Sequence, residues 1–533
     1  MKGIVVCPQP RAADVGAEML HRGGTAFDAA VATAFAQMAV DPFMCGLGGM
    51  GTLHYHVGAT GESGMIDFHN RAGAEVVPDM WAADIRGRTE ISAYTIFDDL
   101  RSDIGYRAIM TPGTVAGLWA THERLCTLPW AALIAPAAAL ARDGFQVTPF
   151  VRDFWARPPM PGVADGMRRI SATEACRKIF LHPDGRLWRV GEVLRNPDLA
   201  ATLEAVAAGG ADAFYRGALA ERIAADFAAN GAFVTAHDLA SYRVRLGQPV
   251  AGSYRGLAVL SNPPPGSGAS LIEMLHILEH FPLGSLEHGS AAHLDLVARA
   301  MAAAHDDRER WLGDPDFVEV PVATMTGKAR AAEWAEKIRG GQFLKGGTVA
   351  PPSCTTHVSV YDEAGNAVSV THTLGTGAGV VTPGLGFVWN NSMKLADPVP
   401  GRANSLAPGK ARTTGMVPTM LLKDGKPFLV VGAPGGSVII SSVLQTILNV
   451  VDFGMSPVEA VSAPRIHCEG GPIFAEARVE GRVVRELAAM GHEIRHSPIS
   501  YDPYQSRAHA IVIDGGRWRG GADPRGGGGV ARA

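Results

Sequence analysis

The 533-residue chain has few cysteines and no long apolar run. Its six cysteines form no C-x-x-C pair, which argues against a zinc ribbon or a thioredoxin-like redox site. Such sparse cysteine fits a reducing compartment. No window reaches the roughly 18 apolar residues of a membrane helix. We therefore expect no membrane-spanning segment.

A marked excess of charge of either sign is also missing. The 48 Lys and Arg against 52 Asp and Glu give a net charge of −4, so nothing predicts binding to nucleic acid or to an anionic membrane surface. The opening stretch MKGIVVCPQP has one lysine and a short apolar run that Pro8 stops. A signal peptide has an apolar centre of roughly 7–15 residues. These features predict a cytoplasmic protein.

Glycine and proline, by contrast, are abundant, and they favour many turns over long helical bundles. The length allows two to four ordinary domains or one large intertwined domain. Helical periodicity dominates the first two thirds of the chain, and alternating strand patterns dominate the last third, with further strands near the start. This arrangement predicts a layered sheet-and-helix fold rather than separate modules.

Some segments carry stronger local signals. Residues 25–40 predict an apolar helix, and residues 355–375 alternate like two strands around a turn at 363–366. The stretch GFVWNNS, residues 386–392, predicts a further strand. The glycine-rich tail, residues 520–533, is expected to be mobile.

Two motifs have structural interpretations. Residues 46–51, GLGGMG, match the G-x-G-x-x-G pattern, but a dinucleotide site needs a strand before it and a helix after it, and here the order is reversed. We interpret this segment as a turn. The charged run at 305–310 lies on a predicted helix, where Asp306 and Arg310 are expected to form an i, i+4 ion pair.

The segment HILEH matches the H-x-x-E-H pattern of an inverted zinc peptidase through His276, Glu279 and His280. On a helix the two histidines share a face and could both reach a metal. No third ligand is indicated, and the amphipathic pattern favours a mostly solvated helix face. A zinc peptidase is kept as an alternative, while our prediction is a protein with no metal and no cofactor.

Residues 353–357 read SCTTH at the start of a predicted strand. A Ser or Cys nucleophile needs a histidine base and an orienting carboxylate, which one sequence cannot place. A threonine inside a chain has no base of its own. At a chain N-terminus its α-amine, with a reference pKa of about 7.7–8, can take the hydroxyl proton. Thr355 could therefore become a nucleophile if the bond before it is cut; the alternative is a polar strand edge.

Many segments together resemble the γ-glutamyltransferase (glutathione hydrolase) family of N-terminal-nucleophile hydrolases. They occur in the family's order, with about its spacing, over nearly the whole chain, and include GGTAFDAAVA, GLGGMG, TPGTVAG, NPPPGSG, TTHVSV, GNAVSVTHTLG, WNNSM, VPTMLL and GAPGGS. The resemblance implies an α/β (α+β) fold: a four-layer αββα sandwich with two stacked antiparallel sheets.

The resemblance also implies that the precursor cuts itself between Cys354 and Thr355. The products would be a large chain, 1–354, and a small chain, 355–533, which form one intertwined domain and stay together as a heterodimer that could itself dimerise. Thr355 would then attack a small amide substrate and form an acyl-enzyme. Water or an amine acceptor would release the acyl group.

Three further residues receive catalytic roles from the resemblance. Thr373 matches the second threonine of the family, which hydrogen-bonds the nucleophile. Gly435 and Gly436 match the glycine pair whose backbone N–H groups bind the oxyanion, a role that suits glycine because its backbone approaches closely and adopts unusual angles.

The pocket for the glutamyl group departs from the family pattern. His69 stands where the family's carboxylate-binding arginine stands, and Arg71, two residues on, would face the same way in an extended strand and could replace it. The remaining positions of the pocket are occupied by Gly375, Ser392, Leu395, Thr414 and Gly415.

The acyl-transfer residues are thus intact, whereas the clamp for an α-amino acid is largely missing. An ammonium group facing Leu395 would lose a charge-assisted partner worth about 1.5–3 kcal/mol. We therefore expect a small anionic amide rather than a standard γ-glutamyl substrate. A true γ-glutamyltransferase, an oxamate amidohydrolase, a glutaryl (cephalosporin) acylase and a binding protein without turnover are the alternatives.

Overall fold

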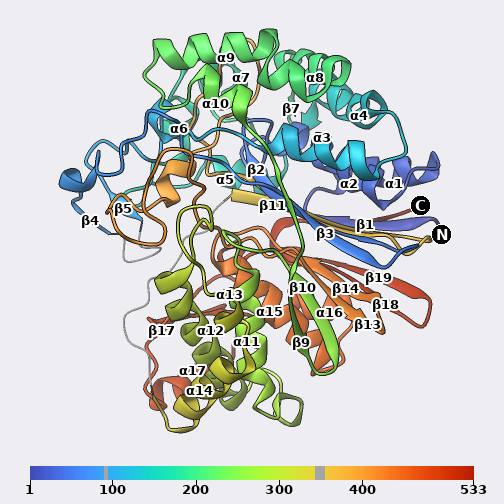
Figure 1. The fold of residues 1–533 in the computed structure, drawn as a ribbon, viewed down its shortest axis with the longest axis vertical. Helices are drawn as coiled ribbons and strands as arrows, with labels where there is room; N and C mark the ends of the chain where they lie inside the picture. The colour runs from blue at the N-terminus through green and yellow to red at the C-terminus, as the bar shows by residue number, and fades with distance from the viewer. Residues whose placement is uncertain (89–93, 343–353) are drawn as a thin grey trace.

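The computed structural model describes residues 1–88, 94–342 and 354–533. Two antiparallel sheets stack face to face, and helices cover both outer surfaces (Figure 1). The predicted four-layer αββα class is confirmed. None of the helices in the described ranges combines the length and apolarity needed to cross a bilayer.

The first sheet has seven strands, and segments from both sides of position 355 are interleaved in it. Its order is β20 (Gly529–Arg532), β1 (Gly3–Cys7), β11 (Cys354–Asp362), β12 (Ala367–Gly375), β2 (Met50–Val57), β3 (Glu62–Phe68) and β8 (Arg245–Gly247). The strands β11 and β12 form the hairpin that the alternation at 355–375 predicts. A cut before Thr355 would leave neither half with a complete sheet.

The second sheet has six strands and also draws on both halves of the chain. Its order is β19 (Arg517–Ala522), β18 (His509–Asp514), β14 (Lys426–Gly432), β13 (Thr419–Lys423), β10 (Leu257–Ser261) and β9 (Val250–Tyr254).

The side chains between the sheets are apolar and buried, because strand residues alternate between the two faces of a sheet. In β1, Ile4 and Val6 belong to the cluster between the sheets, whereas Val5 and Cys7 face the helices. Both faces of this strand are therefore covered, which explains its unbroken apolar sequence.

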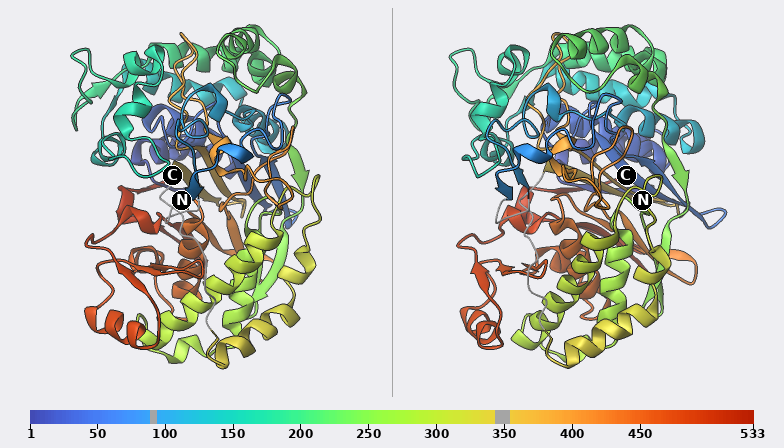
Figure 2. Two further views of the ribbon diagram at one scale, coloured as in Figure 1. Left: turned by 90° about the vertical axis from the view of Figure 1, so that its left-hand side faces the viewer. Right: turned by 60° about the vertical axis from the view of Figure 1, so that its left-hand side comes forward.

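Helices α1 (Pro10–His21), α2 (Ala26–Val40), α3 (Thr114–Leu125) and α4 (Trp130–Asp143) cover the outer face of the first sheet, as Figures 1 and 2 show. All of α2 is buried, as its uniformly apolar sequence predicts, and it packs on β11 and β12. It begins with a capping box in which the backbone N–H of Thr25 donates to Asp28 Oδ2 at 2.8 Å.

The second sheet is covered by α11 (Gly268–Glu279), α12 (Ala291–Trp311), α15 (Val438–Val451) and α16 (Pro457–Ser462). The described chain also contains further helices and short strands outside these layers. These are β4 (Gly87–Arg88), β5 (Thr95–Ile96), β6 (Phe145–Gln146), α5 (Pro149–Trp155), α6 (Gly166–Ile170), α7 (Glu174–Phe180), β7 (Val193–Leu194), α8 (Pro197–Tyr215), α9 (Ala218–Ala229), α10 (Ala236–Ser241), α13 (Val322–Met325), α14 (Lys328–Arg339), β15 (Ile466–His467), β16 (Ile473–Ala475), α17 (Gly481–Ala489) and β17 (Ile494–His496).

The tail differs from its prediction. Instead of being mobile, it ends in β20, which pairs with β1, and the two termini meet where the backbone N–H of Lys2 donates to the Ala533 carbonyl at 2.6 Å (Figure 1). Without β20, the strand β1 would be an edge with a row of unpaired backbone groups. This long-range pairing outweighs the local flexibility that glycine confers.

The strand expected at 386–392 is also absent. Trp389 makes only an isolated bridge to Gly48, and the side chain of Asn390 donates to the carbonyls of Gly48 and Met110 at 2.8 Å each. The segment is buried and held by these side-chain bonds and by isolated backbone bonds, such as the one from the Trp389 N–H to the Val380 carbonyl at 2.9 Å, rather than by a continuous strand ladder.

The motifs interpreted as structural are confirmed in part. Residues 46–49 form a turn closed by a hydrogen bond from the Gly49 N–H to the Gly46 carbonyl, and the last two residues of the motif, Met50 and Gly51, begin β2. Arg310 pairs with Asp306 at 3.1 Å. The prediction that α11 has a mostly solvated face was wrong, since the helix is buried from Gly268 to Leu278. It lies between β9 and β10 on one side and α12 and α14 on the other.

Candidate active site

Thr355 lies at a β-bulge near the start of the central strand β11. Cys354 pairs with Gly375 and Thr356 with His372, so one residue of β11 faces two residues of β12. A bulge of this kind changes the direction of a side chain. Thr355 lines a cavity of about 770 Å³. Ser353, also singled out in the SCTTH motif, lies outside the described residues.

The hydroxyl and carbonyl of Thr355 are held by contacts from two other parts of the chain, the end of β12 and Arg507. Its Oγ1 donates to Thr373 Oγ1 at 3.1 Å, and Thr373 Oγ1 also accepts from the Gly375 N–H at 2.9 Å. Gly375 has φ of 78°, a conformation that favours glycine. Arg507 Nη2 donates to the Thr355 carbonyl at 3.1 Å. Thr355 is only 2% exposed and is therefore tightly positioned.

A buried network below β11 fixes the neighbouring residue, Thr356. Gln37 of α2 donates to Thr356 Oγ1 at 2.8 Å, Thr356 donates to Gln9 Oε1 at 3.0 Å, and Gln9 donates to Asp41 Oδ2 at 2.7 Å. His372 contacts Gln37 Oε1 at 2.8 Å, and burial lowers the pKa of His372 to about 3, so it is neutral at pH 7. Sequence reasoning missed this network, because its members are far apart in the chain.

The glycine pair lies at the N-terminus of the long helix α15. Gly435 has φ of 141° and Gly436 has φ of 72°. A Cβ on Gly435 would lie 2.9 Å from the Cβ of Ser506, so the close approach also requires glycine. Gly436 and Ser437 line the cavity with Thr355. The positive end of α15 thus faces a place where negative charge could develop.

The H-x-x-E-H motif is not arranged as a metal site. His276 Nε2 accepts from the Ser253 N–H at 3.2 Å, and Glu279 accepts from the Arg255 N–H at 2.7 Å and pairs with Lys328. In the part of the chain that the structure describes, the His, Cys, Asp and Glu side chains close enough to share an ion are those of His305, His467 and Glu469.

Two members of that second cluster, His305 and Glu469, line the cavity of Thr355, and His467 lies behind them. Glu469 Oε1 accepts from the Ser437 hydroxyl and from His467 Nε2, the latter at 3.1 Å. His467 Nδ1 lies 2.7 Å from Ser441 Oγ. His467 and Glu469 are thus engaged with each other and with serine hydroxyls, whereas His305 Nε2 is buried with no hydrogen-bond partner among the described residues. We assign the His467–Glu469 pair a role in fixing Ser437 beside Gly436.

Only some of the predicted substrate-binding residues lie at the cavity of Thr355. Thr414 lines the cavity with Thr355. The side chain of Ser392 is buried and donates to Asn70 Oδ1 at 2.7 Å, and Gly375 contributes the backbone N–H described above. Leu395 and Gly415 also line the cavity.

His69 and Arg71 are not brought to this cavity. His69 is buried with its Nδ1 3.0 Å from Asp67 Oδ1, and Arg71 Nη1 lies 3.8 Å from Asp314 and 3.9 Å from Asp316. The strand β3 ends at Phe68, so the alternation that would align the two side chains does not continue beyond it.

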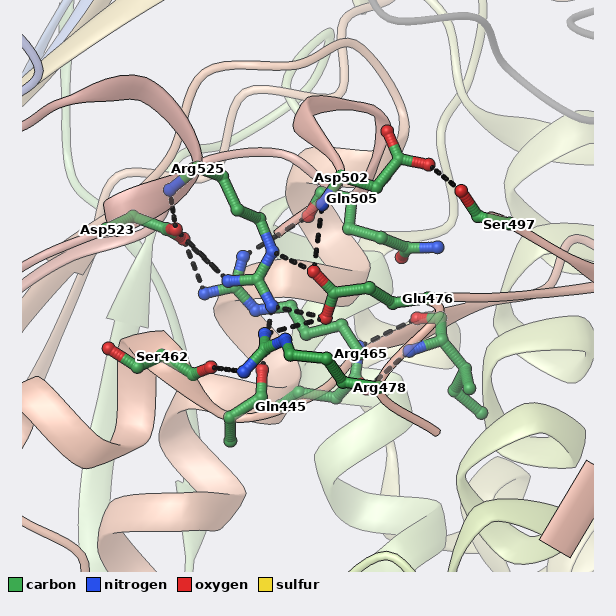
Figure 3. Close-up of polar contacts among 12 residues, drawn as sticks. Gln445, Ser462, Arg465, Glu476, Arg478, Ser497, Asp502, Gln505, Asp523 and Arg525 are labelled. Atoms are coloured by element: carbon green, nitrogen blue, oxygen red, sulfur yellow. Dashed lines mark hydrogen bonds and ion pairs between the residues drawn. The ribbon is translucent and has the colours of Figure 1, made fainter. Parts of the chain in front are cut away.

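A buried ion network, formed by Arg465, Glu476, Arg478, Asp523 and Arg525, holds the segment that carries Arg507 (Figure 3). Arg465 pairs with Asp523 at 2.7 Å and donates to the carbonyls of residues 505 and 506 at 3.2 and 3.3 Å. Asp523 accepts from the N–H of residue 508 at 2.9 Å. The network therefore fixes the backbone on both sides of Arg507.

A stacked αββα sandwich whose central strand starts beside a cavity defines the class of N-terminal-nucleophile hydrolases. Within that class, the chain belongs to the family described as gamma-glutamyltranspeptidase, whose model matches residues 12–533. The family resemblance read from the sequence is confirmed.

Individual relatives cover nearly the whole chain. The "Acylase ACY 1 proenzyme" of Pseudomonas sp. (strain SE83) is 37% identical over 98% of this chain and 95% of its own length. The "Glutathione hydrolase proenzyme" of Escherichia coli (strain K12) is 37% identical over 90% of this chain and 83% of its own. The crystal structure of cephalosporin acylase from Bacillus halodurans superposes with a TM-score of 0.88 at 28% identity, covering 100% of this chain and 96% of that one.

Proposed function

We propose that this chain is a self-processing amide hydrolase or acyltransferase that uses Thr355 as an N-terminal nucleophile. One observation carries the proposal: Thr355 Oγ1 lies 3.1 Å from Thr373 Oγ1 and shares a cavity with Gly436 at the N-terminus of α15. Relatives named acylase and glutathione hydrolase proenzymes support an amide-cleaving enzyme made as a precursor.

Self-processing starts from the intact peptide bond between Cys354 and Thr355. The Thr355 hydroxyl attacks the Cys354 carbonyl, and the peptide C–N bond breaks as the C–O ester bond forms, with the hydroxyl proton passing to the nitrogen. This step frees the Thr355 α-amine, and water then hydrolyses the ester to give the Cys354 carboxylate and to restore the Thr355 hydroxyl. The two chains remain associated, because both sheets contain strands of each.

Turnover uses the α-amine that this cut creates. The amine takes the proton of the Thr355 hydroxyl as the oxygen attacks the substrate amide. The N–H groups at Gly435 and Gly436, with the N-terminus of α15, stabilise the oxyanion. The leaving amine takes the proton and departs, and water or another amine then attacks the acyl-enzyme. Thr373 positions the nucleophile.

The acyl group is not a standard γ-glutamyl group in this proposal. Leu395, which lines the cavity, takes the position of the family residue that holds the α-ammonium group. An acylase among the relatives and a cephalosporin acylase among the structural neighbours support this version.

We also place the enzyme in a reducing cytoplasm, because the cysteines whose side chains are described are free.

A substrate panel tests the proposed specificity. Purified enzyme is expected to release p-nitroaniline faster from glutaryl-p-nitroanilide than from γ-glutamyl-p-nitroanilide, by about tenfold or more in kcat/KM. Ammonia release from oxamate is measured alongside. A γ-glutamyl substrate that proves the best of the three would instead favour a true γ-glutamyltransferase.

Replacing Thr373 with valine is expected to slow both self-processing and turnover by about 10- to 100-fold, because the Thr355 hydroxyl loses its acceptor. The rates are measured by gel densitometry and by p-nitroaniline release. Thr373→Ser keeps the hydroxyl and should stay within a few-fold of the wild type. Processing of Thr373→Val at the wild-type rate would contradict the positioning role.

A further inference from the structure

The cavity that contains Thr355 is rich in basic side chains. Six basic residues line it against three acidic ones: Arg88, Arg308, Arg310, Lys394, Arg402 and Arg412 against Glu309, Asp397 and Glu469. Four of these bases have an acidic partner. Arg88 and Arg402 pair with Asp397, Arg310 with Asp306, and Lys394 with Asp103.

Arg412 differs from those four bases. It is 4% exposed, and no carboxylate in the described ranges pairs with it. Its one hydrogen bond within those ranges runs from Nη1 to the Thr413 carbonyl at 2.8 Å, and its Nε is buried without a partner. A buried cation without a counter-charge is costly, which indicates a place for an anionic ligand.

A second arginine adds to the positive charge at this place. Arg308 lies near Arg412, and its Nε donates to the Ser267 hydroxyl at 2.9 Å. Burial lowers the pKa of Arg412 to about 10, and the charge of Arg308 acts in the same direction, so Arg412 is still protonated at pH 7. Glu469 is nearby as well, but its Oε1 is engaged with Ser437 and His467.

The backbone places Arg412 beside the reacting centre. The segment from Arg412 to Gly415 lines the cavity and then packs so closely on Gly436 that a Cβ on Gly415 would lie 2.1 Å from the Gly436 carbonyl oxygen. Three residues of extended chain span at most about 10 Å. The guanidinium is therefore tied to the proposed oxyanion site by a short stretch of chain.

We propose that Arg412, flanked by Arg308, binds a carboxylate at the far end of the acyl group, so that the substrate is the monoamide of a short dicarboxylic acid. This inference rests on the proposed acyl-enzyme function. The leaving amine must depart and water must enter while the acyl group stays attached to Thr355. Because Arg412 is buried where it lines the cavity, its position suits the retained acyl group rather than the leaving group.

The test compares two anilides of equal chain length. Glutaryl-p-nitroanilide carries a terminal carboxylate, whereas valeryl-p-nitroanilide does not. The wild type is expected to prefer the glutaryl compound by about 10- to 100-fold in kcat/KM. Arg412→Met should lose that preference mainly through a raised KM, and its activity on the valeryl compound should stay within about twofold. Arg412→Lys should retain part of the preference, since it keeps the charge but not the planar fork.

The matched control is Arg310→Gln, which removes a positive charge from the same cavity. Its guanidinium is already paired with Asp306, so the preference should change by less than about twofold. An Arg412→Met enzyme that still prefers the glutaryl compound, or a wild type that prefers the valeryl compound, overturns the inference.

Binding of glutarate, measured by calorimetry, supplies a readout that does not depend on turnover. Arg412→Met should bind glutarate at least about tenfold more weakly than the wild type, and equal affinities overturn the inference. Thermal melts confirm that the variant is folded. Failure of the proposed function itself is recognised separately, because the wild-type chain would then remain uncut on a denaturing gel and be inert on both anilides.

Discussion

Replacing Thr355 with alanine is expected to leave the 56.0 kDa chain uncut and to abolish amide cleavage. The variant lacks the hydroxyl that attacks the Cys354 carbonyl, so the α-amine needed for turnover never forms. On a denaturing gel the wild type should run as two bands, corresponding to residues 1–354 and 355–533, and the variant as one. Turnover of an anilide substrate should fall by at least about 10³-fold.

Two control variants test whether cutting depends on the hydroxyl of residue 355 rather than on the neighbouring side chains. Thr355→Ser keeps a hydroxyl on the same strand and should still be cut, although more slowly. Cys354→Ala should be cut like the wild type, because the mechanism uses only the carbonyl of that residue. Two bands from Thr355→Ala, or a single band from the wild type, would show that Thr355 is not the processing nucleophile.

Replacing Glu476 with glutamine is expected to lower the free energy of unfolding by about 3–5 kcal/mol. Glu476 is fully buried and accepts from Arg525, at 2.7 Å, and from Arg478, at 2.8 Å, in the network of Figure 3. The neutral amide would leave Asp523 as the one carboxylate of this network against three guanidinium groups, those of Arg465, Arg478 and Arg525. The difference in unfolding free energy is measured by urea unfolding of Thr355→Ala with and without Glu476→Gln. The Thr355→Ala background keeps each protein as a single uncut polypeptide.

The control for this prediction is Glu486→Gln on α17. The Glu486 side chain is 42% exposed and pairs with Arg482 at 2.9 Å, so its loss should cost no more than about 1 kcal/mol. In the processed enzyme, Glu476→Gln should also lower activity, since the network fixes the backbone around Arg507, which holds the Thr355 carbonyl. A change in unfolding free energy below 1 kcal/mol would contradict the assigned importance of the network.

Local pattern predicted the elements whose neighbours are close in sequence. The β11–β12 hairpin, the turn within 46–51 and the apolar helix α2 were expected from alternation, glycine spacing and periodicity, and all are present. The predictions of a mobile tail at 520–533 and of a strand at 386–392 were wrong, because the conformation of both segments depends on contacts with residues distant in the chain. The tail pairs with β1, and the segment at 386–392 is held by side-chain bonds of Asn390 and isolated backbone bonds of Trp389.

In the candidate site, too, motifs predicted some residues correctly, whereas the position of others depended on the tertiary structure. Motifs placed Thr355, Thr373 and Gly436 in one reaction scheme, and the structure places all three around one cavity. Extended-strand alternation predicted a joint anion site at His69 and Arg71, but β3 ends before them and their side chains face acidic residues elsewhere.

By itself, the sequence determined the family, the sandwich fold and the candidate nucleophile, because these depend on residue types at fixed spacings. Only the tertiary structure decided which charges face the cavity and which are already paired. Arg71 lies near Asp314 and Asp316, whereas Arg412 is buried without an acidic partner among the described residues. The physical reason is that the charge available to a ligand depends on burial and on partners distant in the chain, and a local motif contains neither.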